Sequence, residues 1–427
     1  MKQKVSIIGL GYVGAPLAYL AAAKGLKVVG IDTSEQKVLD INKYNNVPEQ
    51  LSKYINSVKD NLIAFNDYSN IKDSDIIIIC VPTPTINNVP DLNMLNNAID
   101  GISTYLKDKC LVIIESTIAP GMTKKHVEER LSRYNIILGK DYDLAYCPER
   151  VDPGNRTYWV GNINRVCGAS SEESLNKAIN FYKKVLDSKI ISMNSIEEAE
   201  LVKVWENSTR NMAIAQANLL AKICDNKNMD VETVISGLKS KTEQFPLNIA
   251  HPGIGPGGHC IPEDIHYLID VVKDIDMGLF KESVKINESM PQYAVDKLIE
   301  ELKKEGTILK DLNIVMLGIS YKPNTNDTRR SQAKVLFDIA KELGANITYF
   351  DPIVDNIEDY KAKKILNNIL KQNDVIILGC AHSMFLDIDF SKYSNIKYVL
   401  DCWNKYYGSN LTHTHIKHIG IGKKTGD

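Results

Sequence analysis

The sequence lacks several features that would point to a particular class of protein. Its cysteines include no C-x-x-C pair, which argues against a zinc site or a disulfide framework and favours reduced thiols. The formal net charge is only −2, which argues against a nucleic-acid or polyanion surface as the main function. The cysteines are scattered along the chain at Cys80, Cys110, Cys147, Cys167, Cys224, Cys260, Cys380 and Cys402.

A long hydrophobic run is also missing. The apolar stretch at the N-terminus, MKQKVSIIGLGYVGAPLAYLAAA, is interrupted by regular glycines and by Pro16, so we do not interpret it as a signal peptide. No other segment approaches the roughly 20 apolar residues that a membrane span requires. We therefore expect a cytoplasmic protein without a membrane partner.

The chain is long enough for two or three domains, at 427 residues. Alternating strand and helix patterns precede and follow one long helical stretch from Ser195 to about Asn228, which begins with a capping box of Ser195 and Glu198. The predicted fold is α/β, with two Rossmann-like doubly wound domains joined by a long central helix and a helical middle domain. The expected domains are residues 1–194, 195–305 and 306–427, with a disordered tail at residues 420–427.

Two parts of the chain repeat each other weakly. VSIIGLG and GLKVVGID, within residues 5–32, have counterparts in NIVMLGIS and GANITYFDP, within residues 313–352. The repeat indicates that each lobe offers a ligand crevice at the carboxyl ends of its strands.

Gly9, Gly11 and Gly14 form a G-x-G-x-x-G motif between a predicted strand and a predicted helix. Such glycines permit a tight turn and let a pyrophosphate approach the N-terminus of the helix. Asp32 ends the following strand, where a carboxylate accepts hydrogen bonds from the adenosine ribose and repels a 2′-phosphate. The motif therefore predicts NAD, rather than NADP, as the cofactor.

The segment GIGPGGHCIPEDIHYL, residues 253–268, holds a single cysteine among glycines and prolines. Free cysteine is usually a small buried side chain, but this segment has few side chains to fill a core and lets a substrate approach its backbone. A metal site of His259, Cys260 and His266 lacks the usual paired spacing. In an NAD enzyme, a nucleophilic cysteine can form a thiohemiacetal with an aldehyde, then a thioester, and finally release a carboxylate.

That chemistry requires groups that stabilise an oxyanion. Lys203 and Asn207 are four residues apart on the long helix and share a face, and Arg210 lies near the same stripe. A solvated polar stripe would explain the same residues. From the residues alone, both interpretations stay open.

Seven ordered motifs together resemble the nucleotide-sugar 6-dehydrogenases of the UDP-glucose/GDP-mannose dehydrogenase family, over nearly the whole chain. The motifs are GLGYVG, CVPTPT, ESTIAPG, CPERVDPGN, ELVKVWENSTR, GIGPGGHCIPED and YKPNTNDTR. The resemblance implies NAD-dependent four-electron oxidation of a UDP-sugar C6 hydroxymethyl group to a carboxylate, for the synthesis of surface polysaccharide or glycan precursors. It also implies a homodimer formed through the long helix.

The resemblance further implies a role for each matching residue, and it implies no metal. The implied catalytic residues are Cys260 as the nucleophile, Lys203 and Asn207 for the oxyanion, and Glu149, Thr117 and Asp264 for the hydrolytic water. The implied NAD contacts are Gly9, Gly11, Tyr12, Val13, Gly14, Asp32, Lys37, Thr83, Thr117 and Arg329. The implied sugar-nucleotide contacts are Glu149, Arg150, Val151, Lys203, Asn207, Arg210, Ile249, His251, Gly253, Gly257 and Lys322.

Departures from the family pattern help to choose a branch. Arg150 replaces the aromatic residue of the UDP-glucose and GDP-mannose branches, and Glu263 stands where UDP-glucose enzymes typically carry a lysine. Both departures disfavour UDP-glucose, and the CPERVDPGN motif is closer to the UDP-N-acetylhexosamine branch. Residues 244–246 differ from the His-Pro-Arg of mannosamine enzymes, and Arg330 replaces an acid. UDP-N-acetylglucosamine, -mannosamine and -galactosamine all stay open as substrates.

Three other functions fit part of the sequence. A UDP-glucose 6-dehydrogenase would share most of the motifs. A two-electron 3-hydroxyacid-type dehydrogenase would share the glycine turn and the Lys/Asn pair, but it would leave the cysteine segment and the second lobe without a use. A nucleotide-binding regulator would bind NAD without turning over any sugar.

The position of Asp32 predicts a cofactor preference. Values of kcat/KM should favour NAD⁺ over NADP⁺ by more than about tenfold, or about 1.4 kcal/mol, because the carboxylate would repel the 2′-phosphate. Steady-state kinetics with both cofactors checks this expectation. Equal values would remove that role from Asp32.

Overall fold

The protein is described here by a computed structural model, which covers residues 3–45, 47–151, 157–242, 244, 247–272, 274–357, 360–361, 366–406, 411 and 415–423. The chain divides into two compact units. Unit 1 comprises Met1–Glu206 and His266–Asp274, and unit 2 comprises Asn207–Ile265 and Ile275–Asp427.

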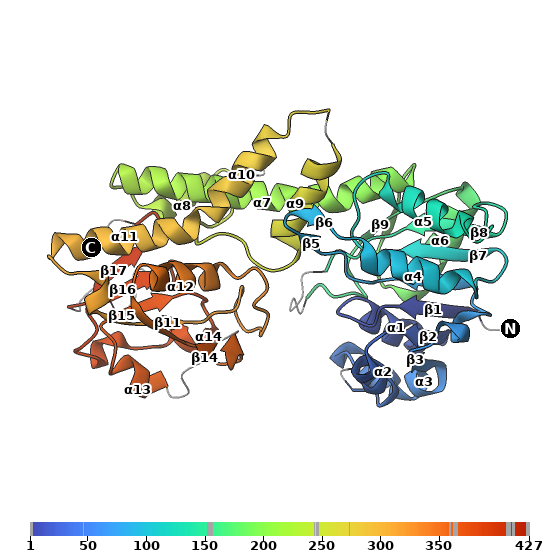
Figure 1. Cartoon of the computed structure of the whole chain (residues 1–427), viewed down its shortest axis with the longest axis horizontal. Coiled ribbons are helices and arrows are strands. Elements are labelled where there is room, and N and C mark those ends of the chain that lie inside the picture. Colours follow the sequence, from blue (N-terminus) through green and yellow to red (C-terminus); the bar gives the residue numbers. More distant parts are fainter. Residues whose placement is uncertain are drawn as a thin grey trace. The chain divides into compact units, whose positions relative to one another are not determined.

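Unit 1 is built on an eight-stranded sheet (Figure 1) with the strand order β10-β9-β8-β7-β4-β1-β2-β3. The strands are β1 (Lys4–Ile8), β2 (Lys27–Ile31), β3 (Leu62–Phe65), β4 (Ile76–Ile79), β7 (Cys110–Ile114), β8 (Tyr142–Tyr146), β9 (Arg165–Ala169) and β10 (Ile190–Ser192). Neighbouring strands are parallel except β8 and β9. The strand order reverses between β1 and β4, which is where doubly wound sheets form ligand crevices.

Helices and one short hairpin complete unit 1. The helices are α1 (Gly14–Ala23), α2 (Glu35–Asn42), α3 (Ile55–Asn61), α4 (Asn93–Ser103), α5 (Met122–Ser132) and α6 (Glu172–Val185), and the hairpin is β5 (Thr85–Ile86) with β6 (Val89–Pro90). The central strand β4 consists of four isoleucines that are at most 2% exposed. A continuous apolar run of this kind is typical of a parallel strand with both faces covered.

Unit 2 contains a second sheet, with the order β12-β11-β15-β16-β17 and all neighbours parallel. The strands are β11 (Asn313–Leu317), β12 (Asn346–Phe350), β15 (Val375–Leu378), β16 (Tyr398–Asp401) and β17 (Lys417–Gly420). The other elements are α8 (Val231–Lys239), α10 (Gly278–Glu288), α11 (Met290–Lys304), α12 (Gln332–Glu342), α13 (Leu366–Leu370), α14 (Ser383–Leu386) and the hairpin β13 (Asn356–Ile357) with β14 (Tyr360–Lys361). The predicted α/β class with two doubly wound sheets is confirmed.

Two helices contribute residues to both units: α7 (Ile196–Asn226) and α9 (Cys260–Val271). The predicted start of α7 is correct, since the N–H of Glu198 donates to Ser195 Oγ at 3.2 Å. The Glu198 carboxylate, however, accepts from the N–H of Asn194 at 2.8 Å, one residue earlier than in a regular capping box. Asn194, the residue before the N-cap, is therefore also hydrogen-bonded to the first turn of α7.

The prediction of a disordered tail is wrong for residues 420–423, and the rest of that tail lies outside the described residues. Gly420 completes β17, a strand that the sequence analysis missed. Lys423 is fully buried, with Nζ 3.2 and 3.1 Å from the two carboxylate oxygens of Asp230 at the start of α8. The N–H of Gly422 donates to Asp225 Oδ2 at 3.1 Å. These contacts order a stretch whose glycines and lysines alone suggest flexibility.

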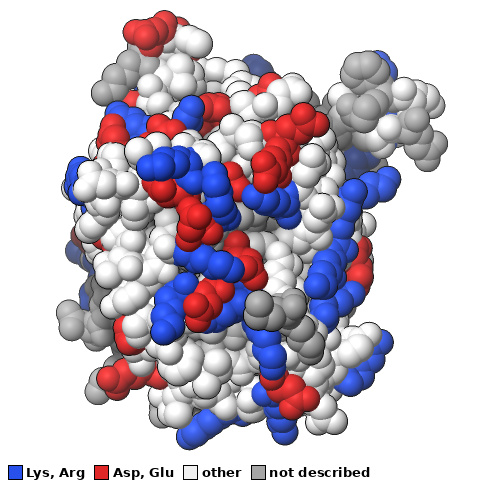
Figure 2. Space-filling model, turned by 90° about the vertical axis from the view of Figure 1, so that its right-hand side faces the viewer, with Lys and Arg blue, Asp and Glu red and all other residues white. Residues whose placement is uncertain are grey.

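The surface agrees with the near-zero net charge. On the face shown in Figure 2, basic and acidic side chains are interspersed rather than segregated. Among the described helices, none combines the length and the apolar character needed to cross a membrane.

Candidate active site

The first glycine motif forms a tight turn after β1. Gly9 has a φ of 91°, and its N–H donates to Ile31 O at 2.8 Å. A Cβ on Gly14 would lie 1.9 Å from Gly9 O, whereas a Cβ on Gly11 would meet no atom within 4 Å. No side chain caps the start of α1, where Val13 is the N-cap residue. The turn therefore fits the pyrophosphate of a dinucleotide, which needs close backbone approach and free helix amides.

Asp32 lies beside this turn and is held rigidly. Its Oδ2 accepts from the N–H of Leu10 at 2.7 Å, and its Oδ1 accepts from the N–H of Ser34 at 2.9 Å. Lys37 Nζ lies 3.2 Å from Oδ2, so two of the predicted NAD contacts pair with each other. A carboxylate has roughly four acceptor positions, which leaves capacity for ribose hydroxyls. Tyr12, also predicted to contact NAD, is 74% exposed.

Unit 2 repeats this turn, as the weak sequence repeat predicted. Gly318 has a φ of 82°, and its N–H donates to Phe350 O at 2.8 Å. The next N–H, of Ile319, donates to Asp351 Oδ2 at 2.9 Å, as Leu10 does to its aspartate in unit 1. The two lobes thus share one design, in which the glycine turn after the first strand is hydrogen-bonded to the end of the second strand and to the aspartate that follows it.

The second turn differs where the cofactor would bind. The Asp351 side chain is fully buried, and its carboxylate accepts from four backbone N–H groups and lies 3.1 Å from His382 Nε2. The second and third glycines of the motif are replaced by Ser320 and Pro323. Because the carboxylate is saturated and the glycine spacing is absent, this turn does not suit a dinucleotide.

Two further predicted NAD contacts lie together at the carboxyl edge of the first sheet. Thr83 and Thr117 follow the neighbouring strands β4 and β7. Thr83 Oγ1 donates to Thr117 O at 2.7 Å. Tyr267, in the second half of α9, donates to Thr83 O at 2.6 Å. Both threonines are therefore positioned near the β1–β4 crossover point.

The part of α7 in unit 1 carries Lys203, which is 8% exposed. One turn earlier, the fully buried Glu200 accepts from the N–H groups of Gly121 at 2.6 Å and Thr123 at 2.7 Å, at the start of α5. Burial raises the pKa of Glu200 to about 7, although hydrogen bonds from Thr123 and Gly121 act in the opposite direction. The sequence analysis did not single out Glu200, which fastens this part of α7 to the ESTIAPG segment.

Glu149 and Arg150 follow β8. Glu149 is 8% exposed, and its Oε1 accepts from the N–H of Val151. Arg150 Nε donates to Glu206 Oε2 at 2.8 Å, and its Nη1 donates to Asn164 O at 3.2 Å. Arg150 is thus tied to α7. Residues 152–156 of the same motif lie outside the described residues.

Cys260 is the first residue of α9, at the end of the glycine segment. A Cβ on Gly255, Gly257 or Gly258 would lie 2.6–2.7 Å from other protein atoms. The sequence predicts that these glycines admit a substrate, whereas in the structure they let the segment itself pack closely. His259 Nδ1 lies 3.5 Å from Cys260 Sγ, a contact that sequence spacing did not reveal.

Two asparagines on α7 hold the first turn of α9. Asn207 Nδ2 donates to Asp264 Oδ2 at 2.6 Å, so two predicted catalytic residues are in contact. One turn further along, Asn211 Nδ2 donates to Ile261 O at 3.2 Å. These bonds fix both the position and the rotation of the turn that begins with Cys260.

A third asparagine on the same face holds the other end of the segment. Asn218 Oδ1 accepts from the N–H of Gly253 at 2.9 Å, and its Nδ2 donates to Asn287 Oδ1 at 2.9 Å. Asn287, on α10, in turn donates to Asn211 Oδ1 at 3.0 Å. We call Asn207, Asn211, Asn218 and Asn287 the asparagine ladder.

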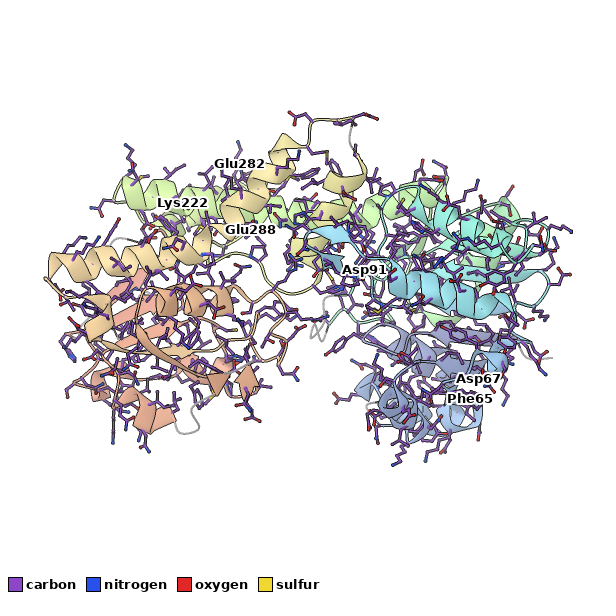
Figure 3. The ribbon with its side chains drawn as sticks, in the orientation of Figure 1. Phe65, Asp67, Asp91, Lys222, Glu282 and Glu288 are labelled. Carbon is purple, nitrogen blue, oxygen red and sulfur yellow. The ribbon has the colours of Figure 1, made fainter. Side chains whose placement is uncertain are left out.

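The ladder lies where α10 packs along α7. Lys222 on α7 also reaches across, and its Nζ donates to Ser289 Oγ at 2.8 Å. Figure 3 labels Lys222 on α7 and Glu282 and Glu288 on α10. The sequence contained a signal for the ladder, because asparagines spaced by four and seven residues share one helical face.

Three other predicted sugar-nucleotide contacts lie in unit 2, and two of them, His251 and Ile249, have protein partners. His251 lies between Lys239 Nζ, 3.0 Å from its Nε2, and Glu232, 3.4 Å from its Nδ1. Ile249 packs against the hydrophobic core of unit 2, and Arg210 is exposed on α7.

Two predicted contacts follow the second glycine turn. Lys322 Nζ lies 5.7 Å from the centroid of the Tyr321 ring. Arg329, a predicted NAD contact, donates from Nη2 to Asp327 Oδ2 at 2.6 Å. Burial opposes the charged form of Asp327, but the hydrogen bonds from Arg329 outweigh it and hold the pKa below its usual value.

The predicted catalytic residues are divided between the units. Glu149, Thr117 and Lys203 belong to unit 1, and the others, Asn207, Cys260 and Asp264, belong to unit 2. Within the part of the chain that the structure describes, no group of three or more His, Cys, Asp or Glu side chains could hold a metal ion.

Comparison with known proteins accounts for nearly the whole chain. Sequence models of the UDP-glucose/GDP-mannose dehydrogenase family match in order: the NAD binding domain over residues 3–186, the central domain over 197–289 and the UDP binding domain over 315–407. A UDP-N-acetyl-D-mannosamine dehydrogenase of Methanococcus maripaludis is 33% identical over 393 residues, which are 90% of this chain and 88% of the relative.

Two more relatives extend the comparison. A UDP-N-acetyl-D-glucosamine 6-dehydrogenase of Salmonella typhi is 31% identical, over 93% of this chain and 95% of the relative. The solved structure of a UDP-D-ManNAc dehydrogenase from Pyrococcus horikoshii superposes with a TM-score of 0.90 at 30% identity, over 99% of this chain and 100% of that one. The chain therefore belongs to the UDP-glucose/GDP-mannose dehydrogenase family and is an NAD-dependent UDP-sugar dehydrogenase.

Proposed function

We propose that this enzyme oxidises the C6 hydroxymethyl group of a UDP-N-acetylhexosamine to a carboxylate, with Cys260 as a covalent nucleophile. One observation carries the proposal: Cys260 begins α9, and Asn207 on α7 donates to Asp264 in the next turn at 2.6 Å. The asparagine ladder holds Gly253, at the start of the glycine segment, and Ile261 and Asp264, just after this cysteine. A structural thiol would not require so constrained a setting.

The residues of the first lobe fit the cofactor. The turn of Gly9, Gly11 and Gly14 would hold the pyrophosphate, and Asp32 would hold the ribose. Bound NAD⁺ supplies the hydride acceptor for each of the two oxidations. Thr83 and Thr117 would line the same crevice, since they follow adjacent strands at its edge.

The side chains around Cys260 have distinct tasks in this scheme. Cys260 Sγ adds to the C6 aldehyde that the first oxidation leaves, and His259, 3.5 Å away, is the candidate acceptor of the thiol proton. The N-terminal end of α9 carries partial positive charge, which favours an anionic sulfur. The Lys203 ammonium group and the Asn207 amide stabilise the alkoxide of the thiohemiacetal.

The second oxidation converts the thiohemiacetal to a thioester, which water must then cleave. Glu149 accepts a proton from the attacking water, the C–S bond breaks, and Cys260 leaves as the thiolate. Thr117 and Asp264 orient the water. The contact between Asp264 and Asn207 supports this division of tasks, because it couples the residue for the oxyanion to one for the water.

The choice of an N-acetylated sugar rests on the relatives and on Arg150. The two curated relatives described above are named for UDP-N-acetyl-D-mannosamine and UDP-N-acetyl-D-glucosamine. Arg150 stands where an aromatic residue is expected for UDP-glucose, and its bonds to Glu206 and Asn164 O hold it in place. The Gln-Phe-Pro stretch that bears on mannosamine lies partly outside the described residues, because Phe245 and Pro246 are not covered.

We further propose that the enzyme is a homodimer formed through α7. Leu201, Trp205, Leu219 and Ile223 are 42–49% exposed, and their spacing places them on one helical face. An exposed apolar stripe of this kind is typical of an interface.

Light scattering should give twice the mass of the chain, and Trp205→Glu should shift the mass toward a monomer. A monomeric wild-type enzyme would contradict the dimer.

The function is tested by product and cofactor yield. Incubation with UDP-N-acetylglucosamine, -mannosamine, -galactosamine and UDP-glucose should give NADH with one of the N-acetylated sugars, at two equivalents per sugar consumed. Mass spectrometry of the product should show the carboxylate. A single equivalent of NADH would favour a two-electron dehydrogenase, and preferential use of UDP-glucose would contradict the N-acetylhexosamine assignment.

Substitution of Cys260 tests the covalent step. Cys260→Ser can still add to an aldehyde but would form an ester, which hydrolyses more slowly because oxygen donates into the carbonyl better than sulfur. This variant should accumulate a covalent sugar adduct, visible by intact-protein mass spectrometry after incubation with substrate and NAD⁺. Cys260→Ala should form no adduct and should not complete the second oxidation. Normal carboxylate release by Cys260→Ala would show that the sulfur is structural.

A further inference from the structure

Two departures from the family pattern, Glu263 and Arg330, are in contact with each other. Arg330 Nε donates to Glu263 Oε1 at 3.0 Å, and the side chains are 30% and 10% exposed. Glu263 lies in the first turn of α9, three residues after Cys260. The acid thus stands on the helix of the proposed nucleophile, and the base stands on the second lobe. A partly buried pair between Arg and carboxylate is directional and strong compared with an exposed one.

The backbone around Arg330 lies directly on the glycine segment. The N–H of Gly258 donates to Arg329 O at 3.0 Å, and a Cβ on Gly257 would come within 2.8 Å of Arg330 O. The adjacent Ser331 is the N-cap of α12 and donates from Oγ to Ile319 O at 2.7 Å. The loop that carries Arg330 is therefore anchored on one side to α12 and touches the cysteine segment on the other.

Arg330 also has an unfavourable backbone conformation. Its φ is 46°, in the left-handed region that glycine adopts without strain and that a long side chain adopts at a cost. Such conformations persist where the surrounding structure requires them. This is an independent indication that the guanidinium group, rather than the backbone turn alone, is needed at this position.

We propose that Glu263 and Arg330 are a positioning pair that locks the first turn of α9 onto the loop after the second glycine turn, and so orients Cys260 Sγ for attack on the sugar carbon. The asparagine ladder holds the same turn from α7 through Asn207 and Asn211. The inference rests on the proposed role of Cys260 as nucleophile. It assigns to the two departures a joint role, since each provides the charge that the other needs.

The experiment compares single, conservative and exchanged variants of the pair. Arg330→Met and Glu263→Gln should lower kcat about tenfold with KM little changed, because the substrate contacts remain while the sulfur is misplaced. Arg330→Lys should retain most of the activity. The double variant Glu263→Arg with Arg330→Glu should have a higher kcat than the less active of Arg330→Met and Glu263→Gln, because the exchange restores the ion pair.

A second measurement reports on the sulfur without any turnover. Iodoacetamide labelling of Cys260, followed by peptide mass spectrometry, should change in rate in Arg330→Met and return in Arg330→Lys. Cys80, also partly exposed, serves as the reference within the same molecules, because its labelling would rise if the whole protein loosened. If Glu263→Gln does not fold, the Arg330 variants still test the positioning pair. Arg330 is the more exposed of the two side chains, so its substitution disturbs folding less.

The matched control is another Arg–carboxylate pair between two elements. Arg130 on α5 lies 3.2 Å from Asp100 on α4, with side chains 18% and 34% exposed. Arg130→Met removes an ion pair of the same type from unit 1 and should leave both kcat and Cys260 labelling unchanged.

The possible results separate this inference from the proposed function. Unchanged kcat and labelling in Arg330→Met, or an exchanged variant no better than the worse single variant, would overturn the positioning pair. A raised KM with unchanged labelling would also overturn it and make Arg330 a substrate contact. If Cys260→Ala keeps normal activity, the proposed function itself fails, whatever the labelling shows.

Discussion

Three asparagines on helix α7 hydrogen-bond to the chain on both sides of Cys260, at Gly253 before it and at Ile261 and Asp264 after it. The segment that leads to Cys260 contains too many glycines and prolines to define its own position, so its shape depends on external partners. Asn211, Asn218 and Asn287 are at most 3% exposed, and in this setting an unpaired amide is costly, which makes the network close to all-or-none. Substitution of Asn211, Asn218 or Asn287 would therefore displace the cysteine, although these three residues have no part in the proposed chemistry.

The two lobes show how one local design serves two purposes. Each has a strand, a glycine with positive φ and an aspartate that accepts from the backbone just after that glycine. In the first lobe the Asp32 carboxylate can still accept further hydrogen bonds, and Gly11 and Gly14 leave the N-terminus of α1 accessible to a ligand. In the second lobe the acceptor positions of the Asp351 carboxylate are occupied by backbone N–H groups and His382. The same geometry therefore has a structural role there. The loop that it supports carries Lys322, Arg329 and Arg330.

The contact between α9 and the second lobe also gives a reason for Glu263 and Arg330, two departures from the family pattern, to be present in the same chain. An acid at position 263 would be poorly accommodated at 7% exposure without a cation, and Arg330 provides one at 3.0 Å. Sequence comparison treats the two positions as separate anomalies, whereas the structure makes them one interaction.

The sequence by itself determined the fold class and the nature of the chemistry. Apolar runs such as the four isoleucines of β4 predict buried parallel strands, and the glycine motif with Asp32 predicts a dinucleotide crevice, because both signals are local. The pairing of Asn207 with Asp264, the links from Asn211 and Asn218, and the contact of Arg330 with Glu263 join residues 35 to 67 positions apart. Only the tertiary structure could decide these pairings, because hydrogen-bond partners depend on which helix faces meet. The same reason explains the wrong prediction at residues 420–423, where Lys423 is ordered by Asp230 at the start of α8, 193 positions earlier in the chain.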